Sequence, residues 1–373
     1  MPLLPSLLLL PVLVRLVLDV HAGGLNLVLQ FWQAALQPSL DPVLLRSLLD
    51  AVATTLFMAV LSWVISTAAG LILGLLCSQR VATLFGGSGR MSTVLKYMLA
   101  PLRALHELIW GLLLLQLFGL NGWVAVLAIS LPYSALMARV VADQLDNRSS
   151  SAALALRNGG APAGAILITA VLPEAAKGLL SHSGHRLDCA LRSAVLLGVF
   201  GLGGIGTDLA LSLQSLRFQE VWSGLWLLAV LMLVLDRLRC RPLLLGVLVL
   251  LCLASASSQL DLSVPQFTSP LLNISSEQLL PALLGTPWAE LIGGTLMVTL
   301  MAAAIAIGLP PLVLLLTLDQ KKLRQPLWAL MRLIPVPLTA LLLLLMFQPS
   351  ALLAAVALGL HHSGVMGLSL IHI

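Results

Sequence analysis

The sequence predicts an all-α protein, a polytopic transmembrane helical bundle of about ten spans arranged as two tandem repeats. Composition is the first observation that predicts it. Apolar residues fill 59% of the 373 positions and charged residues only 9%, whereas soluble domains carry about 45–50% and about 25%. A soluble protein of this size could not cover its surface with so few charges. The composition therefore excludes a soluble globular enzyme.

Recurring apolar runs are the second observation, since a span needs about 20 apolar residues. The first run carries Arg15 late in its length and no small-residue cleavage site follows. We therefore interpret it as a membrane helix rather than a cleaved signal peptide. The expected spans are residues 3–19, 52–76, 98–118, 123–142, 179–200, 221–236, 243–257, 291–316, 333–348 and 351–367.

The orientation follows from the basic residues, which gather in four short segments between these runs. They are Arg80, Arg90, Lys96 and Arg103; Arg139, Arg148 and Arg157; Arg237, Arg239 and Arg241; and Lys321, Lys322, Arg324 and Arg332. The positive-inside rule places all four segments on the cytoplasmic face. Alternation then places residues 20–50, 119–122, 201–220 and 258–285 outside.

Similarity between the two halves is the third observation. Thr55-Leu56-Phe57-Met58 resembles Thr295-Leu296-Met297-Val298, and a constant offset later pairs Arg103 with Arg332 and Met137 with Met366. Leu-rich helices produce single matches by chance, but the shared order of spans and basic loops favours duplication. We expect a first unit at residues 1–240, with its core at 45–240, and an incomplete second unit at 241–367. Tandem repeats around a midplane pathway are typical of transporters.

The second copy stops early, a few residues after Met366, where the first copy continues into a loop and two further spans. The terminal residues 368–373 resemble a translated sequencing-adapter read. We expect them to be non-native, Gly367 to be the last native residue, and the natural protein to continue for about another hundred residues, as the first copy does.

A loop of small residues follows the span at 123–142. It reads Leu154-Ala155-Leu156-Arg157-Asn158-Gly159-Gly160-Ala161, with Leu172-Pro173 further on. This resembles the E-A-A…G…L-P loop of binding-protein-dependent ABC importer permeases, with Gly160 on the family glycine and Ala155 on the first alanine. Leu154 replaces the family glutamate, and Ala170 replaces its isoleucine.

The resemblance implies that cytoplasmic ABC ATPase subunits dock on the loop at 143–165. The residues it assigns to docking are Ala155, Leu156, Arg157, Gly159, Gly160, Ala161 and Pro173. A short helix of small residues ending at Gly159-Gly160 would also present a compact knob on the cytoplasmic face. The alternative is an ordinary helix–turn–helix connection.

A second stretch carries the resemblance further. Residues 186–198, from Arg186 to Gly198, continue into Gly201-Leu202-Gly203-Gly204-Ile205-Gly206. They resemble the R-x-E-x-x-x-R-S/A-x-x-x-x-G…G-x-G-G-I-G segment of phosphonate ABC transporter permeases, with Asp188 in place of the usual glutamate. This likeness covers residues 45–240 and, more loosely, 286–367. It implies the type I ABC importer permease fold.

A third segment, beginning at Arg103, resembles the R-x-x-P-E-x-x-W segment of the same family. Glu107 and Trp110 match this pattern, while His106 replaces the proline.

Three ionisable residues inside one apolar span need an explanation, because charges at the bilayer centre are costly and usually face protein or water. Asp188 and Arg192 are four residues apart and share a helical face, whereas Arg186 does not share a face with Asp188. Asp188 and Arg192 could simply neutralise each other, and this pairing would leave the charge of Arg186 unexplained. An unpaired arginine near a pathway favours an anionic cargo. The expected pathway residues are Arg186, Asp188, Arg192, Gly203 and Gly204.

Several other chemistries are excluded. Residues 201–206 satisfy G-x-G-x-x-G, but a dinucleotide site requires a strand before and an acid about 20 residues later. These glycines better suit a sharp turn near the outer gate. No P-loop pattern occurs, so the chain has no ATP site of its own. His361-His362 lacks a third ligand and no C-x-x-C pair occurs, so we expect neither metal nor cofactor.

The resemblance implies the non-enzymatic permease subunit of a bacterial inner-membrane ABC importer, with two permease units fused in tandem. Its cargo would be phosphonate or a related phosphorus oxyanion. The expected partners are ABC ATPase subunits, an extracytoplasmic substrate-binding protein and the lipid bilayer, with no nucleic acid. The alternative is a stand-alone secondary transporter or channel driven by an ion gradient, in which Asp188 would be a proton or cation site.

Overall fold

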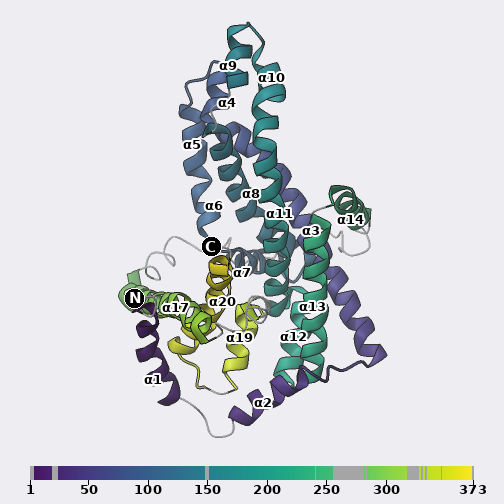
Figure 1. Cartoon of the computed structure of the whole chain (residues 1–373), viewed down its shortest axis with the longest axis vertical. Helices are drawn as coiled ribbons and strands as arrows, with labels where there is room; N and C mark the ends of the chain where they lie inside the picture. Colours follow the sequence, from purple (N-terminus) through teal and green to yellow (C-terminus); the bar gives the residue numbers. More distant parts are fainter. Residues whose placement is uncertain are drawn as a thin grey trace. The chain divides into compact units, whose positions relative to one another are not determined.

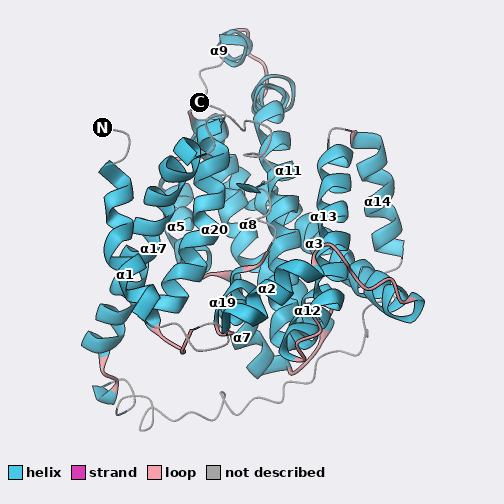
Figure 2. Cartoon of the chain, turned by 60° about the horizontal axis from the view of Figure 1, so that its bottom comes forward, coloured by secondary structure: helices cyan, strands magenta, loops and turns pink. Residues whose placement is uncertain are grey.

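The computed structural model describes residues 4–18, 24–147, 151–239, 241–254, 281, 284–316, 327–328, 331, 334–345 and 347–371. The chain divides into two compact units. The central unit comprises Ala53–Gly204 and Met232–Leu271, and the terminal unit comprises Met1–Val52, Ile205–Leu231 and Leu272–Ile373. Figure 1 colours the chain by sequence, and Figure 2 shows that its described elements are helices. Outside the described residues lie Arg148, Cys240, Lys321, Lys322, Arg324, Arg332 and most of segment 258–285.

The central unit is an α-helical bundle. Helix α3 (Pro42–Cys77) enters it from the terminal unit, and α13 (Phe218–Arg239) ends in it. The helices between them are α4 (Gln79–Leu84), α5 (Arg90–Met98), α6 (Ala100–Ala104), α7 (Glu107–Phe118), α8 (Gly122–Asp146), α9 (Ser151–Asn158), α10 (Ala163–Ile166) and α11 (Leu172–Leu197), with π-helical segments at Leu167–Val171 and Gly198–Leu202. Helix α14 (Pro242–Ala254) follows α13.

The terminal unit is also helical. It contains a 3-10 segment at Leu4–Leu9 followed by α1 (Leu10–Leu18), then α2 (Gly24–Ala34), α12 (Ile205–Gln214), α17 (Trp288–Leu316), α19 (Val336–Leu343) and α20 (Ala351–Ile371). One of its cores joins the N-terminal helix to α17 and α20, through Leu9, Val12, Ile305, Leu352 and Val356.

Five described helices are long and apolar enough to cross a membrane: Pro42–Cys77, Gly122–Asp146, Ala163–Leu202, Phe218–Leu238 and Trp288–Leu315. The expected spans at 52–76, 123–142, 179–200, 221–236 and 291–316 lie on them. Helix α20 covers the expected span at 351–367, whereas α1, α14 and α19 are shorter than the runs expected there. The polytopic α-helical class is therefore confirmed. The described residues supply five long spans, or six if one bent pair is a single span, rather than ten.

The bent pair corrects the expected continuous span at 98–118. Helices Arg90–Ala104 and Glu107–Phe118 meet at 82°. Leu105 and His106 have extended backbone, and the His106 ring accepts a hydrogen bond from the Leu108 N–H (3.3 Å), so that His106 caps the N-terminus of α7. A 12-residue helix such as α7 is about 18 Å long, shorter than the hydrocarbon core of about 30 Å. A cap in mid-run therefore breaks what the apolar pattern alone predicts as one helix.

Helices α3 and α8 pack with their backbones in close approach. A Cβ atom built on Gly70 would lie 2.3 Å from Met137 Cβ, and one on Gly74 would lie 2.4 Å from Val141 Cβ. Nearer the start of both helices, the Ser62 hydroxyl donates to the Val126 carbonyl oxygen (3.3 Å). Small residues are what allow membrane helices to approach this closely.

Helices α17 and α20 of the terminal unit pack in the same way. A Cβ on Gly359 would lie 2.6 Å from Ile305 Cβ and 3.1 Å from the Ala302 carbonyl oxygen. Under the offsets of the sequence repeat, Ala302 corresponds to Ser62, and Gly359 corresponds to Ser130, one turn from Val126. Under these offsets, the contacts of the two helix pairs lie about one helical turn apart.

We expect Gly70→Ala to destabilise the protein by about 1–3 kcal/mol, because the new methyl group overlaps Met137. Gly246→Ala is the matched control, since Gly246 is also helical and has open space around its Cβ position. There alanine should be neutral or stabilise the helix by about 0.5–1 kcal/mol. Thermal unfolding of the detergent-solubilised protein measures both. Equal melting temperatures for the two variants would contradict the close approach.

Candidate docking loop and transport pathway

The loop that resembles the docking motif forms a short helix, α9, which ends in a glycine turn. Gly160 has φ +78°. The Gly160 N–H donates to the Arg157 carbonyl (3.1 Å), and the Ala161 N–H donates to the Leu156 carbonyl (3.0 Å). This pair of hydrogen bonds is the Schellman cap, which needs a left-handed residue at the Gly160 position. The short helix and its glycine end agree with the structure predicted from the sequence.

The residues assigned to docking are accessible. In α9 the side chains of Leu154, Leu156 and Arg157 are exposed, and Gly159, Gly160 and Pro173 are exposed as well. Ala153 is buried, and it packs with Leu145, Ile166 and Val171, so α9 is attached by one face only. Figure 1 shows α9 at one extremity of the central unit, beside α4 and α10. A cleft of about 560 Å³ lies beside it, lined by Arg80, Thr83, Leu84, Ser151, Ala153, Leu154, Arg157, Ile166 and Val171.

Pro173 follows a local widening of the helix. The Leu172 N–H bonds to the Leu167 carbonyl, five residues back, in the π-helical segment Leu167–Val171. Proline has no N–H to donate and its ring crowds the preceding turn, and a π-turn relieves this crowding without ending the helix. The Leu-Pro of the motif therefore marks the irregular base of a long helix, which continues through Leu197.

Asp146 at the end of α8 anchors the same end of the unit. The carboxylate accepts hydrogen bonds from the Ser78 hydroxyl (2.7 Å), the Arg80 N–H (3.1 Å) and Lys96 Nζ (2.9 Å). Ser78 also caps α4, since its hydroxyl oxygen accepts from the Val81 N–H (3.2 Å). One half-buried carboxylate thus joins α8 to α4 and α5 through charge-assisted bonds. The sequence identifies Arg80 and Lys96 as members of a basic segment, but it does not identify Asp146 as the residue that both of them contact.

Arg186 occupies one face of α11. Its Nε donates to His182 Nε2 (3.2 Å), and its guanidinium carbon lies 5.6 Å from the centroid of the Tyr133 ring. Such a cation–π contact stabilises an arginine without cancelling its charge. Within the part of the chain that the structure describes, Arg186 forms no ion pair with a carboxylate.

A chain of polar groups continues from Tyr133. The Tyr133 hydroxyl is 2.9 Å from the Ser193 hydroxyl, which donates to the Glu107 carboxylate (2.5 Å). Glu107 is 9% exposed. One turn from Arg186, the Trp63 indole N–H donates to the Ser183 carbonyl (2.8 Å). Helices α3, α7, α8 and α11 therefore meet around buried polar contacts.

The sequence predicts Glu107 only as a motif match, and it does not predict that Tyr133, His182, Ser193 and Trp63 belong to this group. The available signal was the presence of polar side chains within otherwise apolar spans.

Asp188 and Arg192 lie on a different face of α11. Arg192 Nη2 is 3.2 Å from Asp188 Oδ2, and each side chain is about a quarter exposed. Asp188 also borders a small gap together with Leu235 and Asp236 of α13. Asp188 and Arg192 therefore share a helical face, as predicted, whereas the Arg186 side chain lies against Tyr133 of α8. The three charges do not form one cluster.

The glycines at the far end of α11 make a turn. Gly201, Gly203 and Gly204 have φ values of +88°, +93° and +79°, and α12 starts at Ile205. Glycine adopts this left-handed backbone conformation without strain. With its 26 residues, α11 is about 39 Å long, so Gly203 and Gly204 lie at the end opposite Pro173. The predicted sharp turn is present.

No family model matches the chain, but individual relatives do. It is 26% identical over 179 residues to the phosphite transport system permease protein PtxC of Stutzerimonas stutzeri, and the alignment covers 47% of this chain and 62% of that protein. It is 27% identical over 221 residues to the phosphate-import permease protein PhnE of Mycolicibacterium smegmatis (54% and 41%). It is 33% identical over 75 residues to the putative cryptic phosphonate transport system permease protein PhnE2 of Escherichia coli (20% and 62%).

Two solved structures are also similar. The inward-facing MetNI methionine ABC transporter aligns with TM-score 0.48 and 19% identity, over 56% of this chain and 99% of the other. An amino acid ABC transporter with histidines aligns with TM-score 0.44 and 17% identity, over 52% and 92%. The chain covers between 41% and 62% of the curated relatives named above. It is thus similar to the membrane permease proteins of phosphite, phosphate and phosphonate transport systems.

Proposed function

We propose that the chain is the transmembrane permease subunit of an ATP-driven ABC importer in a bacterial inner membrane, and that its cargo is a phosphonate or a related phosphorus oxyanion. Similarity to permease proteins of phosphite, phosphate and phosphonate transport carries this proposal. ATP hydrolysis belongs to a partner ATPase, and an extracytoplasmic binding protein delivers the cargo.

The proposed docking element is α9 with its glycine turn. Its exposed face offers Leu154, Leu156 and Arg157 to a soluble partner, while Ala153 holds its other face against α8 and α10. A displacement of α9 would reach α8 through Leu145, and α8 would carry it to α3 through the contacts at Gly70 and Gly74. ATP shifts such an equilibrium only through the preference of the ATPase for one state.

The proposed pathway residues have separate roles. Arg186 keeps its positive charge uncancelled beside Tyr133, so it is the group suited to attract an oxyanion. Asp188 and Arg192 neutralise each other beside α13. Gly203 and Gly204 form the turn at the outer end of α11. Pairing of Asp188 also disfavours the secondary-transporter alternative, which requires this carboxylate as a proton or cation site.

The tandem arrangement remains part of the proposal, with permease units at 1–240 and 241–367 and a non-native tail at 368–373. Helix α19 begins 229 residues after α7, and α20 begins 229 residues after α8. Contacts within about one helical turn of each other in the α3–α8 and α17–α20 pairs support the same duplication. The boundaries of the central and terminal units differ from those of the two permease units, because α1 packs with α17 and α20.

Gly160→Val should abolish partner docking, because a β-branched residue is strongly disfavoured at positive φ and the cap of α9 would open. Gly160→Asn is the matched control, since asparagine tolerates this conformation. We expect at least a tenfold loss of ATPase co-purification and of growth-supporting uptake of phosphite, phosphate and methylphosphonate for the valine variant alone. Both variants should insert into the membrane. Undiminished co-purification and uptake by Gly160→Val would contradict the docking role.

Arg186→Gln should lower uptake of all three anions at least tenfold with little change in melting temperature, because it removes an uncancelled charge. The double variant Asp188→Asn with Arg192→Gln should instead lower the melting temperature and spare more uptake. Tm and initial uptake rates, measured in the same preparations, separate the two. An uptake loss confined to the double variant would reverse the assigned roles.

A further inference from the structure

Helix α2 presents two exposed faces of opposite character. Its exposed apolar side chains are Leu25, Leu29 and Trp32, with exposed fractions from 44% to 57%. Their spacing of four and three residues places them on one face, which we call the apolar stripe. This stripe has no cover in the part of the chain that the structure describes.

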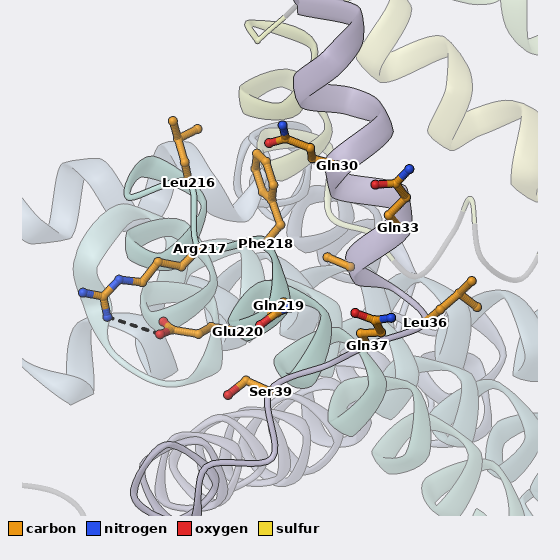
Figure 3. A pocket seen from close by; sticks show the side chains of 11 residues that line it. Gln30, Gln33, Leu36, Gln37, Ser39, Leu216, Arg217, Phe218, Gln219 and Glu220 are labelled. Carbon is orange, nitrogen blue, oxygen red and sulfur yellow. Dashed lines mark hydrogen bonds and ion pairs between the residues drawn. The ribbon is translucent and has the colours of Figure 1, made fainter.

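A polar stripe runs beside it with the same spacing. Asn26, Gln30 and Gln33 are all exposed, and so is Gln37 just beyond the end of α2. Figure 3 shows Gln30, Gln33 and Gln37 bordering an open cleft of about 600 Å³, across from Arg217, Gln219 and Glu220; Leu36, Leu216 and Phe218 also line it. Arg217 and Glu220 form an ion pair at its edge (3.2 Å). This side of α2 is therefore suited to water.

The third face of α2 is fixed to the start of α13. Phe31 is buried, and its ring contacts those of Phe218 and Trp222 at centroid distances of 5.7 Å and 5.2 Å. The Trp222 indole N–H donates to the Phe31 carbonyl (2.6 Å), and the Trp226 N–H donates to the Ala35 carbonyl (3.1 Å). The Ser223 hydroxyl donates to the Ser39 carbonyl (2.7 Å). Helix α2 is thus held at the level of the first turns of a membrane-crossing helix.

We propose that α2 lies in the outer membrane–water interface, with the apolar stripe against lipid acyl chains and the polar stripe against water. A large separation of apolar and polar faces is the mark of interfacial helices. The apolar surface also continues past α2 through Leu40 to Val43, in the first turn of the long apolar helix α3. Tryptophans at this level are typical of membrane interfaces. Lipid is therefore the occupant that matches both the stripe and its continuation.

Spin labelling tests this placement in the full chain. Nitroxides are attached to single cysteines at positions 25, 29 and 32 of the apolar stripe, or 26, 30 and 33 of the polar stripe, after replacing the four native cysteines by alanine. The labelled protein is reconstituted in phosphatidylethanolamine–phosphatidylglycerol vesicles. We expect the ratio of collisions with oxygen to collisions with nickel-EDDA to be several-fold higher at 25, 29 and 32. Equal ratios at the two sets, or little collision with either reagent at the apolar stripe, would overturn the proposal.

Tryptophan quenching gives a second test that needs no label. Native protein and Trp32→Phe are reconstituted with lipids brominated near the headgroup or deep in the acyl chain. Native protein should lose more fluorescence with the shallow bromines than the variant does, and both should respond alike to the deep ones. No difference between them with either lipid would overturn the interfacial position of α2. Neither test depends on ATPase docking or on cargo, so failure here is distinguishable from failure of the transport proposal.

Discussion

The close approach of α3 and α8 is the contact from which the rest of the central unit is organised. Lipid is as apolar as the side chains it solvates, so membrane helices gain little from hydrophobic burial and depend on packing and polar contacts. Gly70 and Gly74 let the α3 backbone come within contact of α8 residues Met137 and Val141. A side chain at either glycine would separate the helices along their whole shared length.

Helix α8 then connects the two proposed functional regions. Toward its C-terminus, Leu145 packs beneath α9 and Asp146 holds α4 and α5. More than three turns earlier, Tyr133 faces Arg186 and bonds to Ser193. A partner bound to α9, as proposed above, would therefore lie one helix away from the buried polar group. Burial of these hydrogen-bonded groups costs little only while every member is satisfied.

Local features could be predicted from the sequence, and contacts between distant residues could not. Apolar run length predicted the long helices, the glycines at 159–160 predicted the end of α9, and four-residue spacing predicted the Asp188–Arg192 pair. The break at His106 was missed because the length and overall composition of a run do not show where a helix is capped within it. The partners of Lys96 and Glu107 lie 50 and 86 residues away, and no periodic pattern encodes such meetings.

The π-helical segment Leu167–Val171 has a consequence for how this chain can evolve. It accommodates one additional residue in the turn that precedes Pro173. Because each residue of an α-helix advances by about 100°, losing that residue would rotate everything beyond it relative to α9. Arg186 would leave Tyr133, and Asp188 would leave its place beside α13. Single-residue insertions or deletions between residue 167 and the Gly203 turn would therefore change the orientation of one end of this helix relative to the other.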